Sequence, residues 1–329
     1  MKNVLLLQID GSTPNLALMR IAQHHRQLGH VVEFRHAPTT RKVEVELFDV
    51  PYERVYASAI FQRSQPVCRR LLDIKPNAIV GGTGWDIKRT LASVGIAENT
   101  VPDYSIYPLY RNSIGFTQRG CRLRCPFCVV PEKEGPNRSV ASIADVWRGE
   151  PWPRNVLLLD NDFFGQPNWR NLIDELNAGK FKVCWNQGFN VRLIDDEQAA
   201  AIASTDYRDD QFKRPRLYTA WDNRKDEERL FRNLTALVRH GVKPDCIMIY
   251  MLVAYWQRGE LTADDFYRHQ RLREFGCRPY PMPYVRNDAT RGFQRWIVGA
   301  YDKRIPWERW VKAGYEPRHL ERQEQLSLF

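Results

Sequence analysis

The chain has 329 residues, of which 43% are hydrophobic, and its formal net charge is +10. This apolar content excludes an intrinsically disordered protein, and the length suffices for one large domain or two. No apolar run reaches the roughly 18–20 residues that a membrane-spanning helix needs, so we expect no membrane partner. The positive charge is compatible with a polyanionic partner but does not require one.

Strand and helix patterns alternate through the first hundred residues. Residues 4–9 form a continuous apolar run, which is typical of a buried parallel strand and not of a signal peptide. Pro14 lies near the start of a helix with an apolar stripe, and Gly29 is well placed as its C-cap. The alternation predicts a doubly wound parallel sheet with further strands at 30–34, 54–61 and 78–80.

A glycine-rich segment ends the last of these strands. Its glycines, Gly81, Gly82 and Gly84, would allow close approach of a ligand to the backbone, and they would equally suit an ordinary turn. Both interpretations remain open from the sequence.

Three cysteines share one short loop, Cys121, Cys125 and Cys128, with the spacing C-x3-C-x2-C. Three adjacent thiolates without a nearby fourth cysteine or histidine can hold a metal centre and leave one coordination position open. A structural zinc site would need a distant fourth ligand, and three cysteines cannot all pair as disulfides. We therefore favour an iron–sulfur cluster over zinc, and free cysteines with such a cluster suit the reducing cytoplasm.

The segment 115–135 around these cysteines resembles the cluster loop of the radical SAM superfamily. In that family the three cysteines bind a 4Fe–4S cluster, and its fourth iron binds the amino and carboxylate groups of S-adenosylmethionine (SAM). Reduction then cleaves SAM and yields a 5′-deoxyadenosyl radical. The resemblance implies this activity and these cofactors, a reductant such as flavodoxin or ferredoxin as a partner, and a place for Phe127 near the adenine.

The N-terminal segment is similar to a shortened form of the cobalamin-binding domain that precedes many radical SAM barrels. Such domains ligate cobalt through the histidine of an Asp-x-His-x-x-Gly loop, and this chain has no such triplet. His24 and His25 lie in the middle of the first predicted helix, where we expect partly exposed residues. The sequence therefore predicts a Rossmann-like fold without cobalamin binding.

Residues 113–284 repeat a strand-then-helix pattern, which agrees with the partial (β/α)6 TIM-type barrel of the radical SAM family. The six predicted strands are 113–117, 155–159, 182–185, 216–220, 246–253 and 278–282. Three of them end in clusters of polar residues, and parallel barrels place their sites at these strand ends.

The resemblance implies roles for these polar residues. Asp160, Asn161 and Asp162 would meet the SAM amino group. The ribose or the carboxylate of SAM would face Gln187, Asn190 and Arg192. SAM or the substrate would contact Asp222. The alternative is that some of them cap the helices that follow.

The composition changes after Tyr284. Four arginines, Arg286, Arg291, Arg295 and Arg304, interleave with four aromatic residues, Phe293, Trp296, Trp307 and Trp310. Such a mixture can bind nucleic acid, or it can form an amphipathic helical cap with its aromatic side chains facing inward. We favour the cap. The predicted organisation is a Rossmann-like domain at 1–105, a partial barrel at 106–284 and a helical extension at 285–329.

The final five residues, Gln325, Leu326, Ser327, Leu328 and Phe329, resemble the peptide by which bacterial replication and repair proteins dock on the DNA sliding clamp. Leu328 and Phe329 would fill an apolar pocket, and Gln325 would form a hydrogen bond at its rim. The alternative is a hydrophobic latch that folds back onto the protein.

Together these features predict a cytoplasmic radical SAM enzyme with an unidentified substrate, for which nucleic acid is one candidate. A tRNA methylthiotransferase-like activity ranks second, because residues 128–131 are similar to that group. Such enzymes usually have further cluster cysteines in the N-terminal domain, where this chain has only Cys68. A different class of protein, a non-catalytic iron–sulfur or zinc scaffold, is the remaining alternative.

Overall fold

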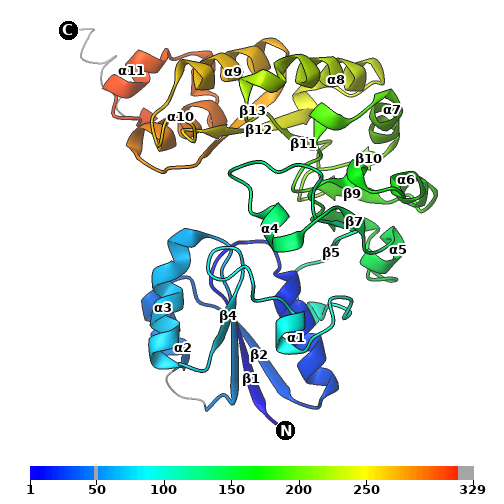
Figure 1. Ribbon diagram of the computed structural model, residues 1–329, viewed down its shortest axis with the longest axis vertical. Coiled ribbons are helices and arrows are strands. Elements are labelled where there is room, and N and C mark those ends of the chain that lie inside the picture. The colour runs from blue at the N-terminus through cyan, green and yellow to red at the C-terminus, as the bar shows by residue number, and fades with distance from the viewer. Residues whose placement is uncertain (48–50, 318–329) are drawn as a thin grey trace. The chain divides into compact units, whose positions relative to one another are not determined.

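The computed structural model describes residues 1–47 and 51–317, so the clamp-like peptide at 325–329 lies outside the described residues. The chain divides into two compact units, both drawn in Figure 1. Both units combine helices with parallel strands, which confirms the predicted mixed α/β class. The first unit comprises Met1–Gly115, Leu123–Gly135 and Pro151–Pro153, and the second comprises Phe116–Arg122, Pro136–Glu150 and the chain from Arg154 onward.

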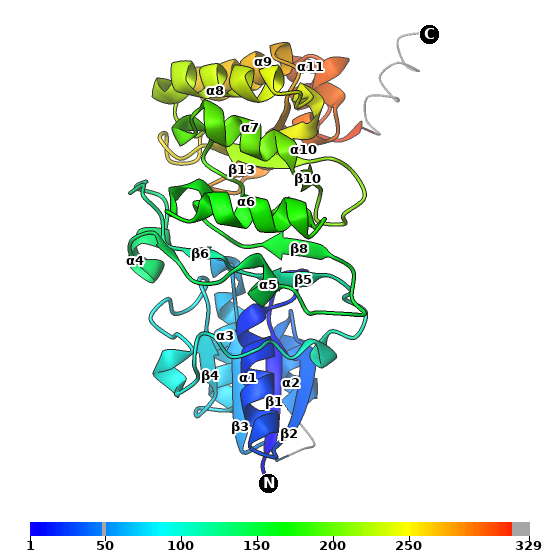
Figure 2. The ribbon, with the colours of Figure 1, turned by 90° about the vertical axis from the view of Figure 1, so that its right-hand side faces the viewer.

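The first unit is built on a parallel sheet with the strand order β2-β1-β3-β4. Helix α1 lies against one face of this sheet, and α2 and α3 lie against the other (Figures 1 and 2). Its elements are β1 Asn3–Gln8, α1 Leu16–Gln27, β2 Val31–His36, α2 Thr40–Leu47, β3 Arg54–Ser58, α3 Gln65–Ile74, β4 Ile79–Gly81, β5 Ser113–Gly115 and α4 Val130–Glu134.

Local signals in the sequence explain the ends of α1. The side chain of Asn15 accepts a hydrogen bond from the backbone N–H of Leu18 at 3.1 Å, which caps the first turn. Gly29 has a φ of +72° just beyond the helix, as its predicted role as a C-cap requires. The apolar side chains of Leu18, Met19 and Ala22 are buried between these ends.

The carboxyl ends of these strands are held together by their own polar groups. The carboxylate of Asp10, after β1, accepts hydrogen bonds from the backbone N–H groups of Ile60 and Phe61 at 2.7 and 3.0 Å. These contacts explain why β3 ends at Ser58, earlier than predicted. A Cβ atom at Gly82 or Gly84 would meet the backbone of residues 59 or 61 within 2.4 Å. The glycines are therefore needed for a close turn against the protein's own backbone.

Two histidines, His25 and His30, lie in contact at the other end of α1. His25 is buried, in contrast to the expected partial exposure, and its Nε2 lies 3.0 Å from the hydroxyl of Tyr56. Its Nδ1 lies 2.9 Å from Nδ1 of His30. Burial, together with the nearby positive groups His24, His30, Arg54 and Lys2, lowers the pKa of His25 to about 4.

We expect the first unit to lose stability as the pH falls from 6.5 to 4. In this interval the unfolded chain takes up a proton at His25, whose ordinary pKa is 6.5, whereas the folded chain takes it up only near pH 4. Hydrogen exchange of peptides from β1 and β3, corrected for intrinsic exchange rates, measures the effect. The variant His25→Gln should depend less on pH, and His24→Gln should behave as the wild type. Equal pH dependence in wild type and His25→Gln would contradict the assignment.

The second unit contains two groups of parallel strands, with the orders β10-β9-β8 and β11-β12-β13. Its strands are β6 Gln118–Arg119, β7 Arg138–Ser139, β8 Asn155–Leu158, β9 Lys182–Trp185, β10 Asp206–Tyr207, β11 Leu217–Ala220, β12 Ile247–Val253 and β13 Arg278–Pro283. Its helices are α5 Ile143–Val146, α6 Trp169–Ala178, α7 Asp196–Ser204, α8 Glu227–Arg239, α9 Ala263–Glu274, α10 Asp288–Val298 and α11 Trp307–Lys312.

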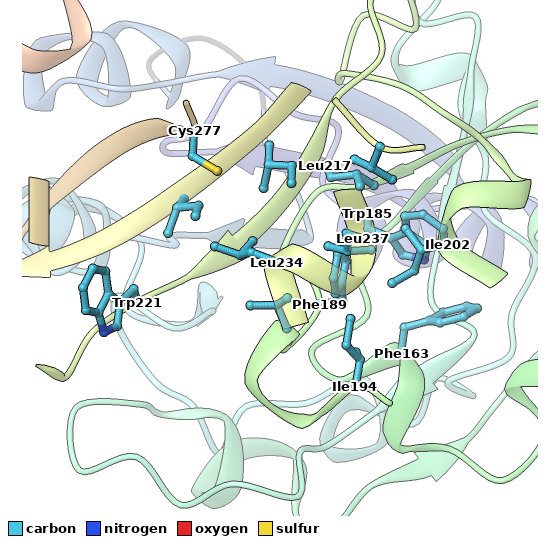
Figure 3. Close-up of a cluster of buried hydrophobic side chains, with 14 of the residues drawn as sticks. Phe163, Trp185, Phe189, Ile194, Ile202, Leu217, Trp221, Leu234, Leu237 and Cys277 are labelled. Carbon is cyan, nitrogen blue, oxygen red and sulfur yellow. The ribbon is translucent and has the colours of Figure 1, made fainter. Parts of the chain in front are cut away.

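The two strand groups meet beyond the end of β9. The backbone N–H of Phe189 donates to the carbonyl of Tyr218 at 3.1 Å, and Gly188 packs so closely there that a Cβ atom would lie 2.8 Å from the same oxygen. One apolar core serves both groups, because Trp185 and Phe189 lie among buried residues of α7, α8 and β11 (Figure 3).

The aromatic residues after Tyr284 face inward. Phe293, Trp296 and Trp310 are buried in the same core as β12 and α9. Trp307 is partly buried against this core, whereas the four arginines of the segment are exposed. This packing agrees with the helical cap and leaves these buried rings unable to stack on nucleic-acid bases.

Candidate functional site

A short antiparallel hairpin closes the base of the cysteine loop. Gln118 and Arg119 of β6 pair with Ser139 and Arg138 of β7. The backbone N–H of Val140 extends the pairing by donating to the carbonyl of Thr117 at 2.8 Å. Residues 120–137 therefore form a long loop with a fixed base.

Asp160, at the carboxyl end of β8, holds one strand of this hairpin. Its carboxylate accepts hydrogen bonds from the backbone N–H groups of Thr117 and Gln118 at 2.8 and 3.1 Å, and also from the hydroxyl of Thr117. Only 2% of Asp160 is exposed. Burial raises its pKa to about 7, and the three hydrogen bonds oppose this rise because they favour the charged form.

Gln118 joins the start of the cysteine loop to the segment after β8. Its side-chain Oε1 accepts from the backbone N–H groups of Asn161 and Asp162 at 3.1 and 2.9 Å. Its Nε2 donates to the carbonyls of Arg119 and Gly120 at 2.6 and 2.7 Å. One fully buried amide thus fixes the two residues that precede Cys121.

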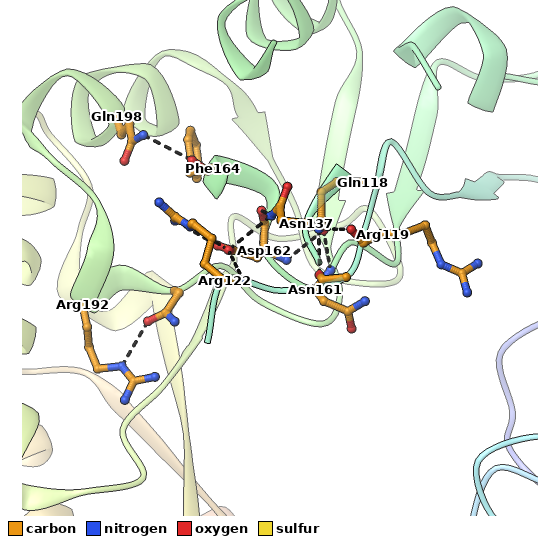
Figure 4. Close-up of polar contacts among 11 residues, drawn as sticks. Gln118, Arg119, Arg122, Asn137, Asn161, Asp162, Phe164, Arg192 and Gln198 are labelled. Atoms are coloured by element: carbon orange, nitrogen blue, oxygen red, sulfur yellow. Dashed lines mark hydrogen bonds and ion pairs between the residues drawn. The ribbon is translucent and has the colours of Figure 1, made fainter. Parts of the chain in front are cut away.

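Asp162 holds both ends of the loop through a buried carboxylate (Figure 4). Arg122 forms a two-point contact with it, Nε to Oδ2 at 2.7 Å and Nη2 to Oδ1 at 3.0 Å. Asn137 donates from the far end of the loop to the carbonyl of Asp162 at 3.1 Å and to its Oδ2 at 3.3 Å. The ion pair also raises the pKa of Arg122, so the guanidinium stays charged.

The absence of a side chain at Gly165 makes room for this arrangement. A Cβ atom at Gly165 would lie 2.3 Å from Oδ2 of Asp162, 2.4 Å from Nδ2 of Asn137 and 2.7 Å from Nε of Arg122. The backbone of Gly165 does not adopt a positive φ. The requirement for glycine is therefore one of space around the three polar groups.

Gly165→Ala is expected to separate Asp162 from Arg122 and Asn137. Overpacking of this kind costs about 1–3 kcal/mol of unfolding free energy, and the loop at 120–137 should exchange its amide hydrogens faster. Urea unfolding and hydrogen exchange of that loop are the measurements. Wild-type stability together with unchanged exchange in the loop would show that the contact is not tight.

The three cysteines are half-buried and form no disulfide. The boundary between the two units falls between Arg122 and Leu123, so Cys121 belongs to the second unit, and Cys125 and Cys128 belong to the first. The backbone N–H of Cys128 donates to the carbonyl of Cys125 at 3.0 Å, which forms a tight turn. Lys133 of α4 donates to the hydroxyl of Thr83 at 3.0 Å within the first unit.

Of the other four cysteines, Cys68, Cys184 and Cys277 are buried, whereas Cys246 is half-buried. Burial raises the pKa of Cys68 to about 11 and that of Cys277 to about 12, and it also raises the pKa of Cys184 and Cys246. A raised pKa favours the neutral thiol and opposes metal ligation. The buried cysteines Cys68, Cys184 and Cys277 are therefore poorly suited to bind a metal.

The donor chemistry of the loop fits an iron–sulfur cluster, since three accessible thiols provide the sulfur ligands that such clusters need. Within residues 1–47 and 51–317, three or more His, Cys, Asp or Glu side chains are nowhere gathered as a metal-binding group. Asp160 and Asp162, the two carboxylates that hold this hairpin, are already bonded within the protein.

The predicted SAM-binding residues lie in contrasting environments. Asp160 and Asp162 are buried in the contacts described above, whereas Asn161 and Phe127 are half-buried and Gln187 is exposed. Contacts with SAM through these side chains stay a prediction.

Arg192 and Asp222 lie after β9 and β11. Arg192 donates from Nε to the side chain of Asn190 at 3.0 Å and forms an ion pair with Asp226. Oδ1 of Asp222 accepts from the backbone N–H of Leu252 at 3.0 Å, and burial raises the pKa of Asp222. Arg192 also affects this carboxyl by lowering its pKa. The structure thus brings charged groups together at the ends of these strands.

Four residues that position the loop were not predicted from the sequence: Thr117, Gln118, Asn137 and Gly165. Thr117 and Gln118 lie in the segment 115–135 around the cysteines, but no recognised spacing distinguishes them from other loop residues. Their roles depend on contacts some 40 residues away along the chain.

Comparisons with known proteins gave no match to a protein-family model, a curated protein or a solved structure. None of the helices that the structure describes is long and apolar enough to cross a membrane.

Proposed function

We propose that this chain is a radical SAM enzyme that uses a 4Fe–4S cluster bound by Cys121, Cys125 and Cys128. The observation that supports this most directly is the C-x3-C-x2-C loop, whose base is fixed at the carboxyl end of the parallel strand β8. When bound, the cluster supplies the electron that cleaves SAM. We further propose that the first unit is Rossmann-like and that β5, β8, β9, β11, β12 and β13 correspond to a partial (β/α)6 barrel.

Two groups of residues would have different roles: one would position the cysteine loop, and the other would bind SAM. Gln118, Asp160 and Asp162 would act as positioning residues, because their side chains bond to the base of the loop. The other polar groups predicted at the strand ends would bind SAM: Asn161, Gln187, Asn190, Arg192 and Asp222. Phe127 would lie near the adenine. Nucleic acid remains a candidate substrate, and the sliding clamp a candidate partner.

Replacing Cys121, Cys125 and Cys128 together with alanine is expected to abolish iron binding. After anaerobic reconstitution, the wild type should contain about four iron and four sulfide ions per chain, and the triple variant should contain almost none. Metal and sulfide analysis measures the cluster itself. Release of 5′-deoxyadenosine from SAM after reduction separately measures the activity.

Cys246→Ala is the matched control, because Cys246 is also half-buried but lies outside the loop. It should keep the full iron content. A triple variant that retained all of its iron would refute the ligand assignment. A wild type that bound the cluster but released no 5′-deoxyadenosine would favour the scaffold alternative.

Gln118→Leu is expected to lower the amount of cluster retained without removing any ligand. The substitution leaves two backbone N–H groups and two carbonyls without their side-chain partner, at a cost of about 1–3 kcal/mol for each buried group that stays unpaired. The loop should become more mobile and lose iron faster to a chelator. Gln270→Leu, at an exposed position of α9, is the control. Equal rates of iron loss in both variants would contradict the positioning role.

A further inference from the structure

We propose that a surface at the carboxyl ends of β12 and β13 binds single-stranded nucleic acid. This surface, called the aromatic edge, comprises Tyr255, Trp256, Arg258, Tyr284 and Arg286. All five residues belong to the second unit and follow directly after two neighbouring parallel strands. Binding of nucleic acid to these residues requires no iron–sulfur cluster, so it can be tested independently of the proposed enzymatic activity.

The aromatic edge has two large exposed rings supported by a third. Trp256 is 54% exposed and Tyr284 is 56% exposed. Both meet Tyr255 edge to face, with ring centroids 4.9 and 4.8 Å from it. The indole N–H of Trp256 donates to the carbonyl of Asp222 at 3.4 Å. Rings that are fixed on one side and open on the other are suited to stacking on bases.

Two loops are joined here, and each has one arginine. The side chain of Asn287 donates to the carbonyl of Gly259 at 2.8 Å, and a Cβ atom at Gly259 would lie 3.2 Å from Cγ1 of Val285. These contacts place the backbones of Arg258 and Arg286, the neighbours of these residues, on adjacent loops. Both arginines are exposed.

The charge of the aromatic edge suits phosphate. In the part of the chain that the structure describes, neither Arg258 nor Arg286 has an ion pair or a side-chain hydrogen bond. Glu260 is the one acidic residue in the segments 254–260 and 282–287. Two available guanidinium groups beside exposed rings match a flexible strand, whose phosphates meet cations while its bases stack. The stacked bases of a duplex would not offer their faces to these rings.

The test is fluorescence anisotropy with a labelled sequence of about 12 nucleotides, supplied as single-stranded RNA, single-stranded DNA and duplex DNA. The wild type should bind a single strand more tightly than the duplex, and comparison of RNA with DNA identifies the preferred strand. Trp256→Ala with Tyr284→Ala should weaken single-strand binding by at least about tenfold. Trp256→Phe with Tyr284→Phe preserves the rings and should bind nearly as the wild type.

The arginines are tested through the salt dependence of binding. Arg258→Gln with Arg286→Gln should reduce the slope of log Kd against log salt by about 1.4, since each phosphate contact to a single strand contributes about 0.7. The control, Arg229→Gln with Arg304→Gln, removes the same charge from exposed positions elsewhere and should keep the wild-type slope. The proposal is overturned if the wild type does not bind, if the double alanine variant binds as the wild type, or if both arginine pairs change the slope equally.

Discussion

Burial of two carboxylates at the end of β8 is the constraint on which the cysteine loop depends. Asp160 and Asp162 are 2% and 1% exposed, and a buried charge is costly unless it is paired or hydrogen-bonded. The chain meets this requirement in two ways. Asp160 accepts hydrogen bonds from a hydroxyl and two backbone N–H groups, whereas Asp162 pairs with a guanidinium. Because all of these partners come from residues 117–122, satisfying the carboxylates also fixes where the cysteine loop begins.

Fixing the base leaves the loop itself more accessible. The three loop cysteines are half-buried, whereas Cys68, Cys184 and Cys277 are packed in apolar surroundings that raise their pKa values. A thiol must lose its proton to ligate a metal, so a core position opposes the chemistry that a loop position permits. The fold therefore separates these three core cysteines from the three cysteines of the loop, although the side chains are chemically identical.

Strand positions were predictable because they depend on local patterns. The apolar runs at 4–9, 182–185 and 246–253 lie within one residue of β1, β9 and β12 at each end. The predicted end of β3 was wrong because it depends on Asp10, some 50 residues away, which binds the backbone beyond Ser58. Gln118 was equally hidden, since its four partners are defined only after folding. The sequence showed that polar residues cluster at strand ends, but it did not show which of these residues would be buried.

The burial of several aromatic side chains was also not predictable from local patterns. Strand geometry explains where these side chains lie. Along β12, Ile247, Ile249, Met251 and Val253 enter the apolar core, so the alternation of side chains places Tyr250 on the opposite face of the sheet. Tyr250 stacks there on Tyr218 with ring centroids 5.9 Å apart, and it meets Tyr280 edge to face at 5.7 Å. Three neighbouring strands thus share a row of phenol rings on the face away from the apolar core. Burial raises the pKa values of Tyr218 and Tyr250 above the ordinary value of a phenol. The row of phenol rings on the sheet is therefore distinct from the aromatic edge, whose rings and guanidinium groups both lie in the loops that follow β12 and β13.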